Sequence, residues 1–449
     1  MLQSQVFKAN DIRGVIGSQW DAGGAWALGR AFAELVDSAH IVVGRDNRVS
    51  SLELQTAFIA GVISAGVSVI DISLASTDGL WFASGFLDIP GAQITASHNT
   101  GAYNGLKLCL SKAQPVSSQF LTDLADRAQR YDRGPVPAPT DPQGSIRQQD
   151  TLPDYVSYLL QQVDTTSIRP LRVVVDAGNG MAGVTAPAVL EHLNVEVIGL
   201  YLDLDGEFPN HPANPLVPAN LVDAQKAVRT HSGDVGFVFD CDADRVVVID
   251  ETGAVVAPSA ITAMIAVQEL TQEPGATIIV NTATSKAVSE IVESLGGNVV
   301  TSKVGHTYMK AMMAAHNAIF GGEHSAHYYF RGFFGADTGM LATLYVLAAL
   351  GTSDLRLSSL VSTYTNYAAS GEINSTVGDP SAAMAGVVAE IGDGAALDWT
   401  DGVKISTDHW WVSLRPSNTE PLLRLNVEAS EEAVMIRLRD KVLSLIKEE

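Results

Sequence analysis

Cysteine is scarce in this chain, because Cys109 and Cys241 are its only two thiols among 449 residues. Two cysteines are too few for a disulfide framework or for a zinc site built from thiolates. Long hydrophobic runs are also missing, since no stretch reaches the roughly 18 apolar residues that a membrane span requires. The first residues show no basic segment followed by an apolar one, the pattern typical of a secretory signal. We therefore expect a cytoplasmic protein without a membrane partner.

Basic residues are few as well. The chain has 28 lysines and arginines against 50 aspartates and glutamates, which gives a formal net charge of −22. This charge would repel a polyanion, so a nucleic-acid partner is not expected. A phosphorylated metabolite would need locally positive charge. Several basic residues do recur in glycine-rich or Ser/Asn-rich segments, namely Arg45, Arg48, Lys107, Arg245, Lys303 and Arg415.

The length predicts several domains, since one domain usually takes about 100–200 residues. A short apolar strand repeatedly leads into a polar, glycine-containing loop that opens an amphipathic stretch, at residues 41–49, 171–183 and 278–285. Such alternation is typical of α/β folds. We predict three related α/β domains, although no sequence repeat is strong enough to show a duplication. The proline-rich residues 134–142 predict an extended linker after the first domain.

The first candidate loop is Thr95-Ala96-Ser97-His98-Asn99, which follows an apolar approach and precedes Lys107. A serine takes part in group transfer when a neighbour activates it or when it already carries a phosphate. Small and polar neighbours leave Ser97 approachable, and Lys107 could stabilise the charge of a transferring phosphoryl group. Taken alone, the pattern is also compatible with a hydrogen-bonded loop serine, and His98 with a structural or a catalytic role.

The second candidate loop is Asp240-Cys241-Asp242-Ala243-Asp244-Arg245, directly after the apolar residues 235–239. Three carboxylates at alternating positions can converge on one hard cation, and Mg²⁺ prefers a few protein oxygens together with water and substrate phosphate. The alternatives are a solvated acidic turn or a calcium loop, but the glycine and distal glutamate of an EF-hand are missing. The segment predicts a magnesium site at Asp240, Asp242 and Asp244.

Two further loops could bind a sugar phosphate. In Gly321-Gly322-Glu323-His324-Ser325-Ala326-His327, the side chains of Glu323 and Ser325 would point the same way and could hydrogen-bond adjacent hydroxyls. The segment Arg415-Pro416-Ser417-Asn418-Thr419-Glu420-Pro421 offers an arginine fork, hydroxyls and an amide to a phosphate that does not react. Neither composition is diagnostic alone, and the same holds for Lys303 and His306.

The four segments in this order resemble the α-D-phosphohexomutase superfamily, most closely its phosphomannomutase/phosphoglucomutase branch. The resemblance covers nearly the whole chain, because residues 11–14 and 44–51 match as well. It implies three similar α/β domains and a smaller α+β C-terminal domain around a central cleft. The domains would be residues 1–145 with the phosphoserine, 146–252 with the metal loop, 253–368 with the sugar loop and 369–449 with the phosphate loop.

The resemblance also implies an activity, the interconversion of mannose 6-phosphate and mannose 1-phosphate, with the glucose pair as a further candidate. Ser97 would carry a phosphate and would share Mg²⁺ with the three aspartates. A hexose 1,6-bisphosphate would be both intermediate and activator. Arg245 would lie against the transferring group, and Lys107, His306 and His327 would lie near the reacting oxygens. Glu323 and Ser325 would bind the 3- and 4-hydroxyls. The remaining substrate contacts would come from Arg13, Arg48, Lys303, Arg415, Ser417, Asn418 and Thr419.

Three positions depart from the family pattern. Thr100 stands where relatives commonly have proline and Cys241 where they have glycine, but neither change removes a functional oxygen. Asn10 stands where some relatives have tyrosine, which weakens any substrate contact of that segment. A phosphoglucosamine mutase and a sugar-phosphate-binding regulator without turnover are the alternatives. The preferred sugar and the oligomeric state stay open.

Overall fold

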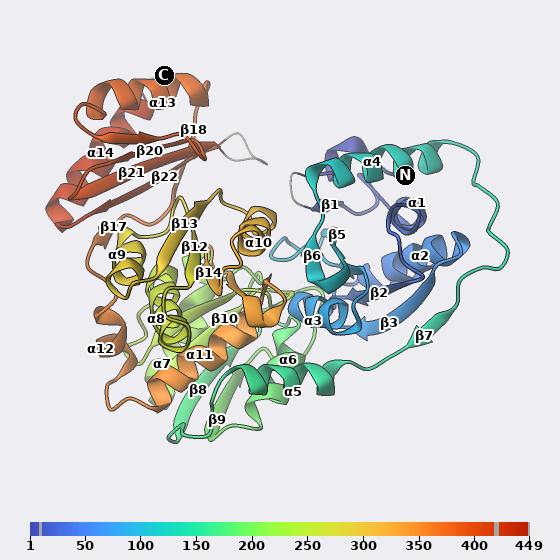
Figure 1. Ribbon diagram of the computed structural model, residues 1–449, viewed down its shortest axis with the longest axis horizontal. Coiled ribbons are helices and arrows are strands. Elements are labelled where there is room, and N and C mark those ends of the chain that lie inside the picture. Colours follow the sequence, from blue (N-terminus) through green and yellow to red (C-terminus); the bar gives the residue numbers. More distant parts are fainter. Residues whose placement is uncertain (9–10, 417–421, 448–449) are drawn as a thin grey trace.

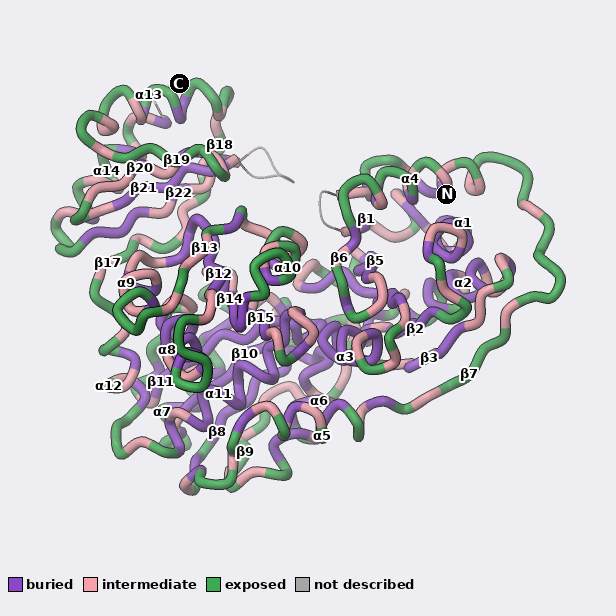
Figure 2. The backbone as a smooth tube through the Cα atoms, in the orientation of Figure 1, coloured by how far each residue is buried: buried purple, intermediate pink, exposed green. Residues whose placement is uncertain are grey.

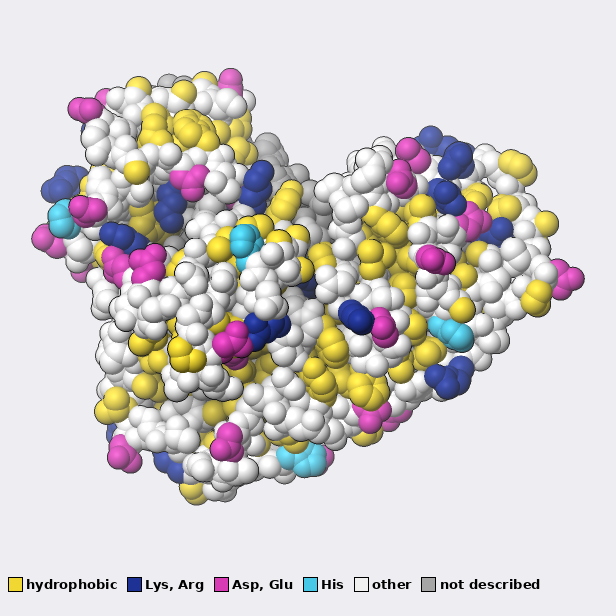
Figure 3. All heavy atoms as spheres, in the orientation of Figure 1, with side chains coloured by type: hydrophobic (Ala, Val, Ile, Leu, Met, Phe, Trp, Pro, Cys, Tyr) yellow, Lys and Arg dark blue, Asp and Glu magenta, His cyan; other side chains and the backbone are white. Residues whose placement is uncertain are grey.

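The protein is represented by a computed structural model that describes residues 1–8, 11–416 and 422–447. Its strands form four sheets, and Figure 1 shows the N-terminal lobe in blue and the C-terminal lobe in red on either side of the middle of the chain. In the space-filling view of Figure 3 a notch separates these two lobes. No described helix is long and apolar enough to cross a membrane.

The first sheet has the strand order β1-β5-β4-β2-β3-β7, and β6 pairs with β5. Its strands are β1 (Ile12–Val15), β2 (His40–Arg45), β3 (Ser68–Leu74), β4 (Gly91–Ile94), β5 (Tyr103–Leu110), β6 (Gln114–Pro115) and β7 (Ile146–Gln148). The accompanying helices are α1 (Ala22–Leu35), α2 (Ser51–Ser64), α3 (Thr77–Leu87) and α4 (Ser118–Arg133). Helix α4 shows how the sequence sets these elements: Ser117 caps its first turn, and Leu121, Leu124 and Ala128 at helical spacing are buried.

The second sheet has the order β11-β10-β8-β9 and the third the order β13-β12-β14-β15-β16. The second contains β8 (Leu171–Asp176), β9 (Val195–Leu200), β10 (Val235–Phe239) and β11 (Val246–Asp250), with helices α5 (Leu152–Gln162), α6 (Ala182–Leu190) and α7 (Val222–His231). The strands of the third are β12 (Thr277–Asn281), β13 (Asn298–Ser302), β14 (Phe320–Gly322), β15 (Tyr328–Phe330) and β16 (Ala336–Asp337). Its helices are α8 (Pro258–Gln272), α9 (Lys286–Ser294), α10 (His306–Ala315), α11 (Gly339–Gly351) and α12 (Leu357–Ser362).

These three sheets share one pattern of four strands. In each, a central strand pairs in parallel with a strand on either side, and the next strand along the chain runs antiparallel at the end of the set. The sets are β3-β2-β4-β5, β9-β8-β10-β11 and β13-β12-β14-β15. The structure thus confirms the expectation of three similar α/β units, and it shows in strand order the similarity that the sequence does not show.

The fourth sheet differs, since all of its pairs are antiparallel. Its order is β17-β22-β21-β20-β19, with β18 paired to β22. The strands are β17 (Ala368–Ala369), β18 (Ile373–Thr376), β19 (Ala396–Asp398), β20 (Val403–Ser406), β21 (Trp410–Pro416) and β22 (Leu422–Ala429), with α13 (Pro380–Ile391) and α14 (Glu432–Lys447). The smaller α+β C-terminal unit is therefore present.

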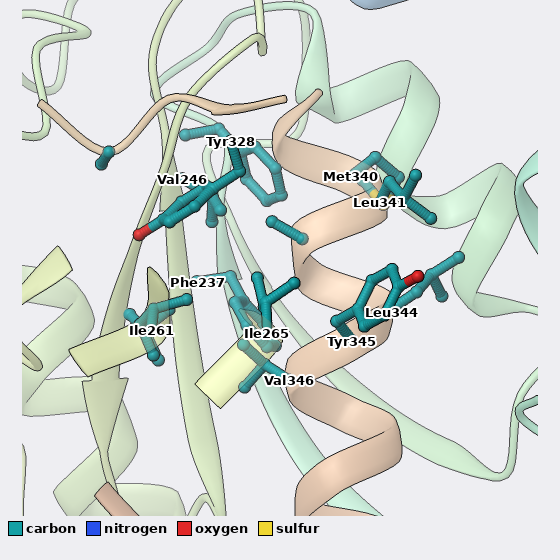
Figure 4. Close-up of a cluster of buried hydrophobic side chains, with 14 of the residues drawn as sticks. Phe237, Val246, Ile261, Ile265, Tyr328, Met340, Leu341, Leu344, Tyr345 and Val346 are labelled. Carbon is teal, nitrogen blue, oxygen red and sulfur yellow. The ribbon is translucent and has the colours of Figure 1, made fainter. Parts of the chain in front are cut away.

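Buried apolar side chains form separate cores. One core runs from Val42 to Val361 and joins all three α/β units. In Figure 4, Val346 of α11 lies beside Ile265 of α8 and close to Phe237 of β10. The fourth sheet has its own core within residues 383–446. Shared burial therefore fixes the first three sheets relative to one another, while the fourth sheet relies on surface contacts.

An extended segment leads from α4 to the second sheet. Residues 134–145 are mostly exposed and run along the outside of the first unit (Figure 2). The segment ends in β7, which pairs in parallel with β3 although it follows the boundary predicted at residue 145. The three boundaries between the four domains stay predictions.

Candidate active site

The three loops singled out in the α/β units occupy equivalent places. Each connects the last parallel strand of its set to the antiparallel strand that follows: residues 95–102 join β4 to β5, 240–245 join β10 to β11, and 323–327 join β14 to β15. Strand order therefore brings each loop to the same edge of its own sheet. The shared core then turns these three edges toward one place.

Ser97 is 3% exposed and has a φ of 49°, a left-handed backbone conformation that is strained for a residue other than glycine. Its Oγ donates a hydrogen bond to Asp240 Oδ2 at 3.0 Å and accepts one from Arg245 Nη2 at 3.4 Å. His98 Nδ1 lies 3.3 Å from the same oxygen. The serine hydroxyl therefore faces the acidic loop directly, across the boundary between two sheets.

Arg48 holds the serine loop in this conformation. Its Nε donates to Asp46 Oδ2 at 3.0 Å, and its other four N–H groups donate to backbone carbonyl oxygens of Ser97, Asn99, Thr100 and Tyr103. All five guanidinium donors are thus used, and none of the side chain is exposed. This corrects the expectation that Arg48 contacts the substrate, because a saturated and buried guanidinium has no donor to offer. Its role in the structure is to position the loop.

The three aspartates converge as the sequence predicts. One carboxylate oxygen from each of Asp240, Asp242 and Asp244 lies within 4.8 Å of the others, and all three residues are buried. Lys107 Nζ donates to Asp242 Oδ2 at 2.7 Å and also to Asp244 Oδ2. The Oδ1 atoms of Asp242 and Asp244 have no hydrogen-bond partner among the described residues. Buried carboxylate oxygens without donors suit a hard cation, so the donor set fits a divalent metal ion.

The electrostatics of this cluster follow from burial. Desolvation, together with Asp242 and Asp244, outweighs Arg245 and raises the pKa of Asp240 to about 8. Burial alone would lower the pKa of Lys107, but the three aspartates raise it, so this lysine stays charged. The acidic loop is also tied to α3, because Thr77 N donates to the Asp242 carbonyl oxygen at 2.8 Å and Thr77 Oγ1 to its Oδ2. Sequence analysis missed Thr77, since nothing near it suggests a partner 165 residues away.

Two histidines predicted near the reacting oxygens lie on different elements. His327 Nε2 is 3.7 Å from Asp244 Oδ1, and His327 forms a backbone bridge with Arg245. Burial lowers the pKa of His327, and burial with Lys310 lowers that of His306, the first residue of α10, to about 4. Both imidazoles are therefore neutral at neutral pH and could accept a proton. Lys303, in the loop before α10, is exposed.

The sugar loop is built around Glu323, which is 1% exposed. Its carboxylate accepts hydrogen bonds from Tyr329 Oη, from Asn281 Nδ2 at 3.1 Å and from the Gly305 backbone N at 3.2 Å. Ser325 Oγ lies 3.0 Å from His327 Nδ1. Glu323 and Ser325 thus both approach the histidine that faces Asp244. Tyr329 and Asn281, which hold Glu323, were not among the sequence candidates.

A cleft of ≈ 1030 Å³ runs between the four sheets. The serine loop lines it with His98–Thr100 and Tyr103, the second unit with residues 214–218, and the sugar loop with His324. Glu372 and Arg424 line it from the C-terminal part of the chain. The predicted central cleft is therefore present, and all four sheets contribute to its wall.

Two further arginines predicted to contact the substrate, Arg13 and Arg415, lie in different units of the chain. Arg13 Nη1 donates to Asn99 Oδ1 at 2.6 Å, beside the serine loop. Arg415, near the end of β21, is 7% exposed, and its ion pairs with Glu372 and Asp401 are long, at 3.5 and 3.7 Å. Ser417, Asn418 and Thr419 lie outside the described residues.

Models of the four domains of one enzyme family match the chain in order. The models for α/β/α domains I, II and III of phosphoglucomutase/phosphomannomutase match residues 4–134, 153–253 and 258–367, and the C-terminal domain model matches residues 372–445. Each matched segment contains the strands of one sheet, except that β7 and β17 lie outside the matches.

Individual relatives and solved structures cover the same length. A phosphomannomutase of Escherichia coli is 38% identical over 459 residues, with 100% of both chains covered. Proteins named phosphohexose mutases in Xanthomonas campestris are 37% identical over 441 residues, with 98% of both chains covered. The crystal structure of a phosphoglucomutase/phosphomannomutase family protein from Burkholderia thailandensis has a TM-score of 0.90 at 30% identity and covers 100% of this chain and 98% of its own.

A more distant structure shares the fold alone. It is an N-acetylphosphoglucosamine mutase variant from Aspergillus fumigatus in complex with glucose 1,6-bisphosphate, with a TM-score of 0.59 at 12% identity, covering 100% of this chain and 95% of its own. Four consecutive domain models and full-length relatives above 30% identity show that the chain belongs to the phosphoglucomutase/phosphomannomutase family.

Proposed function

We propose that this chain is a phosphomannomutase that interconverts mannose 6-phosphate and mannose 1-phosphate and also accepts the glucose phosphates. The names of its full-length relatives support this substrate. The observation that carries the chemistry is the contact of Ser97 Oγ with Asp240 Oδ2 at 3.0 Å, beside three converging carboxylates and the Arg245 guanidinium. A hydroxyl in this setting suits a group that gains and loses a phosphate.

Asp240, Asp242 and Asp244 would hold Mg²⁺ together with a phosphate on Ser97. The orphaned Oδ1 atoms of Asp242 and Asp244 support this assignment. When bound, the ion neutralises charge on the phosphoryl group. Arg245, whose Nε donates to Asp240 Oδ2 at 2.9 Å, is positioned to hold the oxygens of the same group.

The transfer would take place in two half-reactions. In the first, the bond from Ser97 Oγ to phosphorus breaks and a bond from a sugar hydroxyl to phosphorus forms, while the hydroxyl proton passes to a base. His327 and His306 are the candidate bases, because their imidazoles are neutral at neutral pH. The resulting hexose 1,6-bisphosphate turns within the cleft. In the second half-reaction the bond from its other sugar oxygen to phosphorus breaks, that oxygen takes the proton back from the base, and the bond from phosphorus to Ser97 Oγ forms again.

The sugar must therefore be held in two orientations. Glu323 and Ser325 would bind the 3- and 4-hydroxyls, which keep their places when the two ends exchange. Lys107 would stabilise charge at the reacting end, and Arg13 and Lys303 would make further substrate contacts. Arg415, Ser417, Asn418 and Thr419 would bind the phosphate that does not react, whichever end carries it.

Parallel kinetics on mannose, glucose and glucosamine phosphates test the proposal, with Ser97 phosphorylation followed by intact mass. We expect the highest kcat/KM for mannose phosphates, and near inactivity of dephosphorylated protein until about micromolar hexose 1,6-bisphosphate is added. A preference for glucosamine phosphate would identify a phosphoglucosamine mutase instead. Absence of both turnover and Ser97 phosphate with every substrate would indicate a sugar-phosphate-binding regulator.

A further inference from the structure

Glu372 lies between the third and fourth sheets, directly before β18, and lines the cleft. Its Oε1 accepts a hydrogen bond from Arg424 Nη1 at 3.1 Å. Its Oε2 lies 3.4 Å from His324 Nε2 and 3.5 Å from Arg415 Nη2. One carboxylate thus joins the sugar loop, through His324, to two arginines of the C-terminal sheet. We call His324, Arg415 and Arg424 the nitrogen cluster.

The contact with Arg415 is the loose one of the three. Arg415 is 7% exposed, yet its Nη2 makes no hydrogen bond to any described residue, although it lies within ion-pair distance of Glu372. A nearly buried guanidinium with an unused N–H donor is unusual, because burying an unpaired donor costs stability. Such a donor indicates a missing acceptor next to Glu372, which lines the cleft.

Glu372 carries a negative charge at physiological pH. Burial would raise its pKa, but His324, Arg424 and Arg415 together lower it to about 2, so the carboxylate is ionised throughout the physiological range. An anion is therefore already present where the mechanism requires a phosphate to bind.

We propose that Glu372 is an internal substitute for the substrate phosphate. Its carboxylate occupies the nitrogen cluster in the enzyme without substrate, and it releases Arg415 when the non-reacting phosphate binds. This inference rests on the proposed function, because it takes Arg415 as a phosphate-binding residue. A phosphate monoester carries about −1.5 to −2 charge and three acceptor oxygens, so it outcompetes a single carboxylate for the arginine fork. Glu372 keeps its shorter hydrogen bond to Arg424 and stays close by.

Competition between Glu372 and the phosphate for Arg415 acts against binding of the phosphate. Because the carboxylate returns to Arg415 when the phosphate leaves, it weakens binding of the sugar phosphate and speeds its release. The bisphosphorylated intermediate must let go of this cluster between the two half-reactions in order to turn. Glu372 therefore favours turnover at the expense of affinity.

Glu372→Gln tests the idea, because it removes the charge and keeps the side-chain size. Titration calorimetry with mannose 6-phosphate, on dephosphorylated full-length protein, should show a Kd about fivefold lower than wild type. In steady state, kcat and KM should fall together. Glu390→Gln is the matched control: this exposed carboxylate of the same lobe pairs with Lys441 at 2.7 Å, and its variant should bind as wild type does.

An unchanged or higher Kd for Glu372→Gln would overturn the proposal and leave Glu372 as a residue that only positions the arginines. If that variant fails to fold, Glu372→Asp replaces it, since the shorter carboxylate retreats from Arg415 and should also tighten binding. Arg415→Met in the same titration tests the phosphate site separately from the role of Glu372. A Kd unaffected by Arg415→Met would refute the phosphate site itself, whatever Glu372 does.

Discussion

Arg48 and Arg415 are both nearly buried, at 2% and 7% exposure, but the structure holds them in opposite ways. Arg48 uses all five donors and fixes the backbone of the serine loop. Arg415 has two long ion pairs and a donor without a partner among the described residues. In the proposed mechanism, the region that performs phosphoryl transfer is thus assembled in advance, while the region that accepts either end of the sugar is left adjustable.

The preassembled region depends on one oxygen for its chemistry, so Ser97→Ala should have the largest effect. We expect turnover to fall by about 10³ or more while the melting temperature changes little, because the loop loses its phosphoryl carrier and keeps the Arg48 contacts. Steady-state kinetics and thermal unfolding measure the two quantities. Near wild-type rates would remove the basis for separating the two regions.

Asp242→Asn removes one anionic ligand from the same region. We expect activity to fall by about 100-fold and the metal concentration for half-maximal activity to rise, because an amide is a weaker ligand for a hard cation. Metal titration after treatment with a chelator provides the measurement. Activity that is insensitive to both the chelator and the substitution would exclude the metal site.

Replacing each arginine with methionine compares the regions directly. Arg48→Met should lower the free energy of unfolding by about 3 kcal/mol, because Asp46 and four backbone carbonyls lose a buried partner. Arg415→Met should cost less than about 1 kcal/mol and instead raise KM about tenfold, leaving Ser97 phosphorylation intact. Chemical denaturation and kinetics on both variants check this. An equal loss of stability in both variants would contradict the view that Arg48 is held tightly and Arg415 loosely.

The smallest expected effect is the pH dependence of the stability that His211 contributes to a third part of the cleft wall. His211 Nε2 lies 3.1 Å from Asp176 Oδ2, and it fixes the segment that carries residues 214–218 of the cleft. Burial would lower the pKa of His211, but Asp176 raises it above 6.5. The charged contact between His211 and Asp176 therefore makes its full contribution to the free energy of unfolding below pH 6.5. This contribution is lost as pH rises through the raised pKa of His211.

His211→Gln should accordingly lower the melting temperature more at pH 5.5 than at pH 8.5, by about 1–3 °C. Thermal unfolding of variant and wild type at both pH values makes the comparison. An equal or larger loss at pH 8.5 would show that the Asp176 contact does not depend on the charge of His211.

Sequence patterns predicted the parts of the site that lie within one loop. The alternating Asp240, Asp242 and Asp244 after an apolar strand indicated converging carboxylates, and the structure brings them together. The three α/β units and the C-terminal unit also followed from strand patterns and resemblance. Local composition was sufficient here because neighbouring residues on one loop share one location.

What sequence reasoning missed lies between segments that are distant in the chain. Thr77 holds Asp242 across 165 residues, and Glu372 reaches His324 across 48. No spacing rule connects such pairs, since only the packing of whole sheets brings them into contact. The expectation that Arg48 contacts the substrate failed for a related reason. A basic residue in a Ser/Asn-rich loop gives the same sequence pattern whether its donors face a ligand or the backbone.

The shared core has a consequence for how the chain folds during synthesis. The first unit has a core of its own, from Leu2 to Ala128, which can close early on the ribosome. The joint core extends to Val361, so the second and third sheets cannot complete their burial until that residue has emerged. Until then, apolar faces of β8, β10 and α8 are open to chaperones and to neighbouring chains. The C-terminal core, within residues 383–446, forms last and by itself, so the lobe with the adjustable arginine is added to a body that is already complete.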